Sequence, residues 1–447
     1  MNRILISGTN SGAGKTTITC AVLSALKARN ITPTSFKCGP DYIDTMFHRA
    51  VSNIKAYNLD PFFLGGDGLR SHLMAHAESF SVIEGAMGYY DGIGTTNDAS
   101  AYTVARETRT PVVLVVNARG AGSSLAATIE GYSRHRVDSN IKGIIFNEAS
   151  ESRYPDLERI AANAGVKAYG TMPHNADWVL PSRHLGLLTT GEIDDLQNKL
   201  LTMGQQAEQS IDIDGLIALA ETAPTLVADT PFSPQRIANV RLAVTRDEAF
   251  CFLYEENLEL LQALGCEIVF FSPLKDAALP ENIDGLYLSG GYPELHSKTL
   301  ADNTSMRESV RQAIENGLPT IAECGGFLYL NDTLDGFPMC GAIQGTGFET
   351  KSLQRFGYIT MTAEYDNLLC KAGESIRAHE FHYWDSDRPG AGFTARKPGR
   401  DISYTCVHST DSLYAGFPHL YFPGNSAFAE SFVKKMNSSA THERNEF

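Results

Sequence analysis

Cys324 is the residue of this chain with the clearest chemical potential. It lies in TIAECGGFLYL, between a β-branched run and a glycine pair that opens an apolar, helix-like stretch. A thiol at a tight strand-to-helix turn is raised out of its sheet, and the N-terminus of the next helix stabilises a thiolate and offers N–H groups to an oxyanion. Most free cysteines are instead small buried residues. From this segment alone, a nucleophile and a packed thiol are equally open readings.

A glycine-rich loop near the N-terminus predicts a phosphate site. Gly-Lys-Thr at the start of a predicted helix favours this reading over a structural turn. Lys15 can reach the β- and γ-phosphates, and the Thr16 hydroxyl can bind Mg²⁺. The loop is one residue longer than the strict GxxxxGK[ST] pattern, because Thr9 stands where that pattern has its first glycine. The residues assigned to ATP in this loop are Gly8, Thr9, Asn10, Gly12, Gly14, Lys15, Thr16 and Thr17.

Charged residues follow two further predicted strands, at the sheet edge where open α/β folds bind ligands. FKCGPDYIDT contains Lys37, Asp41 and Asp44, and SVIEG ends on Glu84 beside glycines that permit close approach of a ligand. A carboxylate at such a strand end can hold Mg²⁺ directly or through water. Taken alone, Asp91 is typical of a solvated loop charge.

Composition limits the class of protein. A chain of 447 residues exceeds the size of one hydrophobic core, so two domains are expected. A net charge of -15 argues against a nucleic-acid or anionic-membrane surface, and no apolar stretch has membrane-spanning length. Eight cysteines without a CxxC pair indicate neither a zinc site nor a disulfide framework. We expect a cytoplasmic protein with no membrane or nucleic-acid partner.

Two α/β series are separated by a proline-marked stretch. RILIS, PTSFKCG, SVIEG, PVVLVVNA and IKGIIFNEA alternate with helical patterns, and a second series restarts with VRLAVT, EIVFFSP, GLYLSGG and PTIAEC. The first series predicts a mostly parallel sheet, because PVVLVV is apolar throughout. Prolines in APTLVADTPFSPQ mark the boundary. The predicted parts are residues 1–222, a linker over 223–239, residues 240–435, and a flexible tail over 436–447.

Nine segments in order resemble one family: GTNSGAGKT, FKCGPDYID, YNLDPF, IEGAMGYYDG, PSRHLGL, RDEAFCFLYEENL, SGGYPELH, AECGGFLYL and HEFHY. Together they are similar to the cobyrinic acid a,c-diamide synthases, from about residue 3 to about residue 430. The first half resembles dethiobiotin synthetase-like P-loop ATPases, and the second resembles class I glutamine amidotransferases. The resemblance implies a ligase of cobalamin biosynthesis that uses ATP, Mg²⁺ and glutamine to amidate the a and c carboxylates of a corrin ring.

The same resemblance implies a role for particular residues. Cys324 would attack glutamine, His419 in GFPHLYF would act as its general base and acid, and N–H groups of Gly291 and Gly325 would bind the oxyanion. Many class I amidotransferases carry a glutamate two residues after the histidine, but this chain has Tyr421 there. A Cys-His dyad is therefore expected, with the orienting partner of His419 unassigned.

At the synthetase site the resemblance implies three further groups of residues. Thr16, Asp44 and Glu84 are assigned to Mg²⁺, and Lys37 is assigned to phosphate. Asp41, Tyr42 and Asp91 are assigned to the substrate. The substrate carboxylate would be phosphorylated by ATP before ammonia displaces the phosphate.

Alternatives remain at this point. The same chemistry fits nickel sirohydrochlorin or hydrogenobyrinate as the macrocycle. A partitioning-type ATPase with an inert amidotransferase domain is the non-enzyme alternative, which the intact Cys324 segment disfavours. His379 and His382 are read as substrate-side or structural residues, because a zinc site needs three or four ligands. His72 and His76 are expected on a helix surface. A homodimer is an open option.

Overall fold

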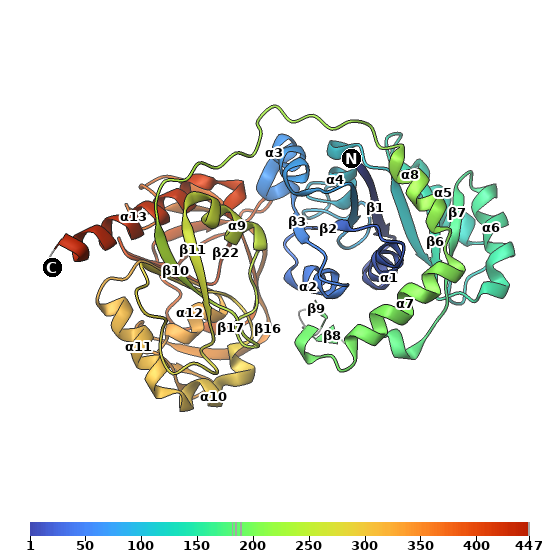
Figure 1. The fold of residues 1–447 in the computed structure, drawn as a ribbon. Coiled ribbons are helices and arrows are strands. Elements are labelled where there is room, and N and C mark those ends of the chain that lie inside the picture. The colour runs from blue at the N-terminus through green and yellow to red at the C-terminus, as the bar shows by residue number, and fades with distance from the viewer. Residues whose placement is uncertain (181, 184–185, 188–189, 446–447) are drawn as a thin grey trace. The chain divides into compact units, whose positions relative to one another are not determined.

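The computed structural model describes residues 1–180, 182–183, 186–187 and 190–445, and it divides into two compact units (Figure 1). The units comprise residues 1–232 and 233–447, so the division falls inside the predicted linker. Residues 222–239 are all described and form no helix or strand. Part of the PSRHLGL segment, residues 181 and 184–185, lies outside the described residues.

The N-terminal unit is built on a seven-stranded sheet in the order β3-β2-β4-β1-β5-β6-β7. Every pairing in it is parallel, as predicted. The run Val112–Val116 is almost fully buried, because helices cover both faces of the sheet. The strands are β1 (Asn2–Gly8), β2 (Pro33–Cys38), β3 (Ala56–Leu59), β4 (Phe80–Glu84), β5 (Val112–Asn117), β6 (Ile141–Asn147) and β7 (Lys167–Met172).

Two groups of helices cover this sheet. One group packs around α1, and the other buries the apolar face formed by residues such as Leu5, Ile83 and Leu114. The first group is α1 (Lys15–Ala28), α2 (Tyr42–Ala50), α7 (Leu196–Ser210) and α8 (Ile213–Glu221). The second is α3 (Pro61–His76), α4 (Ala101–Thr108), α5 (Leu125–Arg134) and α6 (Tyr154–Asn163). Short elements are η1 (Glu151–Arg153), η2 (Ala176–Trp178), β8 (Ser182–Arg183), β9 (Gly186–Leu187) and η3 (Thr190–Glu192).

The C-terminal unit has a six-stranded sheet in the order β11-β10-β12-β13-β21-β20, parallel except for β20. Buried hydrophobic residues of α10, α11 and α12 form one core cluster with residues on one face of this sheet. Helix α9 contacts α13. The strands are β10 (Val240–Thr245), β11 (Cys266–Phe271), β12 (Gly285–Leu288), β13 (Thr320–Glu323), β20 (His408–Ser409) and β21 (Leu413–Gly416). The helices are α9 (Glu255–Leu264), η4 (Pro293–His296), α10 (Ser297–Asp302), α11 (Thr304–Glu315), α12 (Gly325–Leu330), η5 (Phe422–Gly424) and α13 (Ser426–Asn445).

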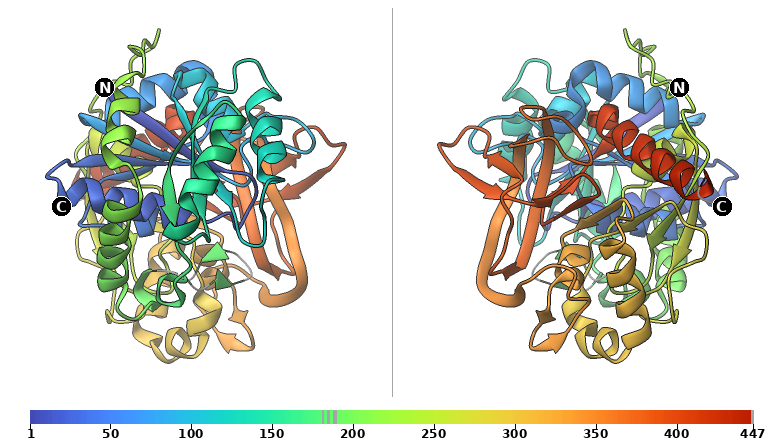
Figure 2. Two further views of the ribbon diagram at one scale, coloured as in Figure 1. Left: turned by 90° about the vertical axis from the view of Figure 1, so that its right-hand side faces the viewer. Right: turned by 90° about the vertical axis from the view of Figure 1, so that its left-hand side faces the viewer.

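A second sheet in this unit runs in the order β15-β14-β16-β17-β22. Its long antiparallel pair β16 and β17 forms the extended orange ribbon of Figure 2. The short strand β22 pairs with β17, where His419 lies opposite His379. The strands are β14 (Thr333–Leu334), β15 (Phe337–Pro338), β16 (Thr346–Ala363), β17 (Ser375–Ser386), β18 (Phe393–Arg396), β19 (Ser403–Cys406) and β22 (His419–Leu420).

Helix α13 runs to Asn445 and so includes residues 436–445 of the predicted flexible tail, where the Met436 side chain is buried. The expectation that His72 lies on a helix surface is wrong: it is 1% exposed, and its ring lies 4.1 Å from that of His76. Within the described part of the chain, no helix is both long and apolar enough to cross a membrane.

Candidate active sites

The predicted phosphate loop connects the end of β1 to the start of α1. Gly14 caps the helix with a left-handed φ of 96°, a conformation that favours glycine. A Cβ at Gly14 would lie 2.0 Å from the side-chain nitrogen of Asn147, which itself donates a hydrogen bond to the Ala13 carbonyl over 3.0 Å. Asn147 ends β6, which lies two strands away from β1 in the sheet, so this more distant strand also holds the loop in place.

Lys15 is folded back over this loop. Its Nζ donates to the Asn10 carbonyl over 3.0 Å, and Tyr132 donates its hydroxyl to the Thr9 carbonyl. Burial, and next the positive charge of Lys37, lower the pKa of Lys15 to about 8. The negative charge around the Lys15 ammonium is therefore too small to balance its burial. An anionic ligand would supply the missing charge.

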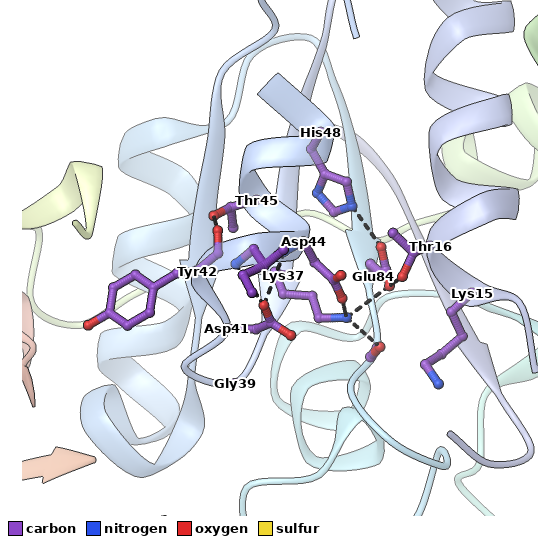
Figure 3. A network of polar contacts seen from close by, with 12 residues as sticks. Lys15, Thr16, Lys37, Gly39, Asp41, Tyr42, Asp44, Thr45, His48 and Glu84 are labelled. Carbon is purple, nitrogen blue, oxygen red and sulfur yellow. Dashed lines mark hydrogen bonds and ion pairs between the residues drawn. The ribbon is translucent and has the colours of Figure 1, made fainter. Parts of the chain in front are cut away.

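Glu84 is the centre of a buried polar network (Figure 3). The Thr16 hydroxyl and the Lys37 ammonium each donate to its Oε1 over 2.8 Å. Lys37 and Glu84 are facing partners on β2 and β4, so the sheet register brings them together. Nε2 of His48 lies 2.7 Å from the other carboxylate oxygen, and Asp44 also contacts the Lys37 ammonium. The structure thus unites Thr16, Lys37, Asp44 and Glu84 as the sequence predicted.

The charges of this network are strongly coupled. Burial opposes ionisation of Glu84, but Lys37 and His48 more than offset it, so the pKa of Glu84 is lowered. Burial, together with the nearby Asp41, raises the pKa of Asp44 to about 8. Although burial disfavours its charge, Lys37 has a raised pKa because Asp44 and Glu84 both face it. Glu84 and Lys37 therefore form the ionised pair.

The three residues assigned to substrate occupy different local environments. Asp41 caps α2, and its Oδ1 accepts from the N–H groups of Ile43 and Asp44 over 2.9 and 3.0 Å. The Tyr42 side chain points away from Lys37 and Glu84 (Figure 3). Asp91 is exposed in the loop after β4 and accepts from the Gly88 N–H over 2.8 Å. These contacts give Asp41 and Asp91 local structural roles.

Sequence reasoning missed two members of the network, His48 and Ser35. The Ser35 hydroxyl lies 2.8 Å from Nδ1 of His48, whose other nitrogen contacts Glu84. A histidine in the last turn of a helix and a serine inside a strand carry no motif of their own. Side chains alternate between the two faces of a strand, so Ser35 and Lys37 share one face of β2, and this spacing is the only sequence signal for the pair.

In the C-terminal unit, Cys324 occupies the predicted strand-to-helix turn. Strand β13 ends at Glu323, helix α12 begins at Gly325, and Cys324 has a φ of 49°, which is a strained value for a residue with a Cβ. Its N–H donates to the Gly416 carbonyl over 2.7 Å, so the turn is held by β21. Cys324 therefore lies at the end of a strand and directly before a helix, the position that nucleophiles occupy in strand-to-helix turns.

His419 lies beside Cys324 in the same unit. It is 2% exposed, and its Nδ1 stands 3.5 Å from Oε2 of Glu323. Burial disfavours a charged imidazole, but hydrogen bonding to Cys324 and Glu323 outweighs it and raises the pKa of His419 to about 10. The structure therefore brings together the predicted Cys324 and His419, and it adds Glu323, which the sequence analysis did not assign.

Gly325 and Gly291 lie side by side near this pair. A Cβ at Gly325 would be 3.0 Å from the backbone nitrogen of Gly291 and 2.8 Å from Cδ of Pro293. The start of α12 therefore approaches the SGGYPE loop as closely as glycine allows. This adjacency places the two predicted oxyanion N–H groups in one region.

His379 and His382 have packing partners in the second sheet. His382 stacks on Phe417 at a ring-centroid distance of 3.9 Å, and its Nε2 lies 3.4 Å from Glu380. His379 faces His419 across the strands, and burial lowers its pKa. No group of three or more His, Cys, Asp or Glu residues suited to a metal occurs among the described residues.

Comparison with known families assigns each unit. The CobQ/CobB/MinD/ParA nucleotide binding domain matches residues 4–187, and the CobB/CobQ-like glutamine amidotransferase domain matches residues 241–426. The fold and sites thus define a two-domain protein with a nucleotide-binding domain followed by a glutamine amidotransferase domain. The predicted α/β fold class is confirmed.

Relatives with the same domain order match over nearly the whole chain. The chain is 38% identical to a cobyrinate a,c-diamide synthase of Caldanaerobacter subterraneus subsp. tengcongensis, over 97% of this chain and 98% of that protein. Identity to the enzyme of the same name from Clostridium acetobutylicum is 37%, over 97% and 100% of the two chains. Identity to the enzyme of the same name from Thermoplasma volcanium is 36%, over 97% of this chain and 97% of that protein. The chain belongs to the cobyrinate a,c-diamide synthase family, which confirms the resemblance seen in the sequence.

Proposed function

We propose that this protein is a ligase that uses ATP and glutamine to amidate the a and c side-chain carboxylates of cobyrinate, in cobalamin biosynthesis. One observation carries the proposal: a single chain holds the Thr16–Glu84 network and the Cys324–His419 pair, and a relative named as a synthase matches it over 97% of its length. Residues 1–222 carry the synthetase chemistry in this proposal, and residues 240–435 carry the release of ammonia from glutamine.

Ammonia is released by Cys324 in the first half of the reaction. His419 takes the proton of the Cys324 thiol, and the thiolate attacks the side-chain amide carbon of glutamine. His419 then gives the proton to the nitrogen that leaves as ammonia. N–H groups of Gly291 and Gly325 bind the oxyanion that forms during the attack. Water then hydrolyses the resulting thioester and frees glutamate and the thiol.

The second half activates the acceptor carboxylate. A carboxylate oxygen of the macrocycle attacks the γ-phosphorus of ATP, which breaks the bond to ADP and forms an acyl phosphate. In this proposal, the charges of Lys15 and Lys37 stabilise the transferring phosphoryl group, and the fold of Lys15 over the phosphate loop supports its part in this. Ammonia attacks the acyl carbon, phosphate leaves, and the amide remains. Asp41, Tyr42 and Asp91 are proposed to contact the substrate. Their contacts in the structure support this role less strongly than the Glu84 network supports nucleotide binding.

The donor set at Glu84 fits Mg²⁺. Thr16, Glu84 and Asp44 offer oxygen atoms only, and this ion is commonly held by one or two carboxylates with phosphate oxygens and water. Bound there, Mg²⁺ would neutralise charge on the ATP phosphates. Lys37 and His48 hold the carboxylate of Glu84 in place.

We also propose that the protein is cytoplasmic. Nickel sirohydrochlorin and hydrogenobyrinate remain alternative macrocycles for the same chemistry. Purified protein should release glutamate and ADP together when ATP, Mg²⁺ and glutamine are supplied with the true substrate. Each macrocycle is tested separately at equal concentration. Stimulation by cobyrinate alone would support the assignment, and stimulation only by another macrocycle would move the function to that substrate. ATP hydrolysis without any amide formation would favour a nucleotide-switched binding protein.

A further inference from the structure

The imidazole of His419 needs a partner that fixes its orientation. For Nε2 to accept the thiol proton, Nδ1 must carry the other ring proton, and an acceptor facing Nδ1 selects that tautomer. In related triads, a carboxylate does this and also stabilises the imidazolium that forms. Tyr421, at the position where many class I amidotransferases carry this glutamate, directs its hydroxyl to Glu256 on α9 at 3.4 Å.

Glu323 occupies the required place in space. Its Oε2 lies 3.5 Å from Nδ1 of His419, which leaves Nε2 for Cys324. The separation exceeds that of an ordinary hydrogen bond, but such contacts are often long in unliganded sites and shorten when substrate binds. Glu323 and His419 are 1% and 2% exposed, so little water competes for their interaction.

The second oxygen of Glu323 anchors the carboxylate to the strand that carries the histidine. Oε1 accepts a hydrogen bond from the Leu420 N–H over 3.0 Å. Asn257 holds the same segment, because it donates to the Leu420 carbonyl and accepts from the Phe422 N–H, each over 2.8 Å. The carboxylate is thus fixed by one oxygen and presents the other to the imidazole.

Other groups near His419 are less suited to this role. His379, opposite on β17, has a lowered pKa and is neutral, so it offers no negative charge to an imidazolium. Tyr287 also contacts Glu323, and its own pKa is raised by burial and by that carboxylate, so it stays a neutral phenol. Of Glu323, His379 and Tyr287, Glu323 is the one that offers a carboxylate to the imidazole of His419.

We propose that Glu323, the residue directly before the nucleophile, is the positioning residue of His419 and completes a Cys-His-Glu triad. The carboxylate comes from the end of β13 instead of from the position after the histidine. This proposal rests on the proposed roles of Cys324 and His419. One short segment, Glu323-Cys324, then supplies both the nucleophile and the group that orients its base.

Glu323→Gln is the most informative variant. The substitution keeps the shape of the side chain, but glutamine has only one acceptor oxygen. If that oxygen accepts the hydrogen bond from the Leu420 N–H, the amide NH₂ group faces Nδ1 of His419. An NH₂ group there favours the tautomer with the proton on Nε2, which cannot accept the thiol proton. Glutamine-dependent amidation should fall by about 10²- to 10⁴-fold, while ammonium-dependent amidation stays within about twofold. Tyr421→Phe is the control and should change neither rate by more than about twofold. An equal loss in Tyr421→Phe, or an unchanged glutamine-dependent rate in Glu323→Gln, would overturn the proposal.

A second readout separates positioning from structural support. Iodoacetamide labelling of Cys324, followed on its peptide by mass spectrometry, reports the thiolate fraction at each pH. In the proposed triad, Glu323→Gln weakens the thiolate–imidazolium pair, so the labelling midpoint should move up by about one pH unit or more. A folded Glu323→Gln protein with the labelling midpoint of the wild type would contradict the triad. A Glu323→Gln protein that lost ammonium-dependent amidation and melted at a lower temperature would also contradict it, because the residue would then act as structural support.

The wild-type protein provides a test that does not depend on the folding of a variant. ¹⁵N-histidine NMR, assigned with His419→Gln, should show Nδ1 of His419 keeping its proton when the ring becomes neutral at high pH. A neutral ring protonated on Nε2 would overturn the proposal. Labelling and NMR need neither ATP nor a macrocycle, so failure of the proposed synthase activity would leave both results interpretable.

Discussion

The hydroxyl of Thr16 lies 2.8 Å from Oε1 of Glu84, which ties the first turn of α1 to the end of β4. The same oxygen accepts from Lys37 on β2, and the other oxygen contacts His48 on α2. One buried carboxylate therefore joins the phosphate loop to two neighbouring elements. Changes at Glu84 should affect both the stability of the N-terminal unit and ATP-dependent chemistry.

Glu84→Gln should destabilise the N-terminal unit by about 3–5 kcal/mol, because Lys37 loses a buried counter-charge and His48 loses its carboxylate partner. The chain has two tryptophans, one per unit, so Trp178 fluorescence in a Trp384→Phe background follows this unit in urea. Glu78→Gln removes the exposed Lys55–Glu78 pair and is the matched control, with an expected cost below about 1 kcal/mol. Equal costs for the two variants would contradict the central role of Glu84.

Lys15→Ala should lower amidation by at least about 10²-fold with either glutamine or ammonium as nitrogen source, because the phosphoryl group loses a stabilising charge. Steady-state rates of amide formation measure this effect. Lys27→Ala, in the last turn of the same helix, should leave the rates unchanged. Normal ammonium-dependent amidation by Lys15→Ala would refute the nucleotide assignment of this loop.

Cys324→Ala should abolish glutamine-dependent amidation and leave ammonium-dependent amidation within about twofold, because only release of ammonia needs the thiol. Cys266→Ala is the matched control, since both thiols are 6% exposed. Activity with both nitrogen sources is measured for each variant. If Cys324→Ala lost both activities, separate sites for the two half-reactions would be excluded.

His419 makes the stability of the C-terminal unit depend on pH. Its pKa is raised to about 10 in the folded protein, so its contribution is fully present below its unfolded pKa of about 6.5 and is lost as pH rises through 10. The wild type should lose a few kcal/mol that His419→Gln does not lose, at about 1.4 kcal/mol per pKa unit. Urea unfolding followed by Trp384 in a Trp178→Phe background measures the difference. Parallel pH curves for the two proteins would contradict the raised pKa that the contacts with Cys324 and Glu323 give His419.

The sequence predicted those parts of the fold and sites that depend on local pattern. Apolar runs located β1, β5 and β13, and the end of each predicted strand placed Lys37 and Glu84 at one sheet edge. The turn at Cys324 followed from its glycines. These features depend on residues that are close in the chain, where periodicity and turn chemistry are informative.

Long-range partners were not predictable in the same way. His48 lies on a helix with no motif, and its contact with Glu84 joins residues 36 positions apart. Glu323 reaches His419 only because β13 and β22 converge, although they belong to different sheets. The long β16–β17 pair was also missed, because the stability of paired strands comes from tertiary packing.

Mass spectrometry of the macrocycle after incubation with ATP, Mg²⁺ and amide-¹⁵N-glutamine tests the proposed function most directly. Cobyrinate should gain two amides, and the ¹⁵N product should be about 2 Da heavier than the product from unlabelled glutamine, because each amide nitrogen comes from the glutamine attacked by Cys324. Omission of ATP should leave cobyrinate unchanged. Unmodified cobyrinate in the complete reaction, with wild-type protein that hydrolyses both ATP and glutamine, would contradict the account.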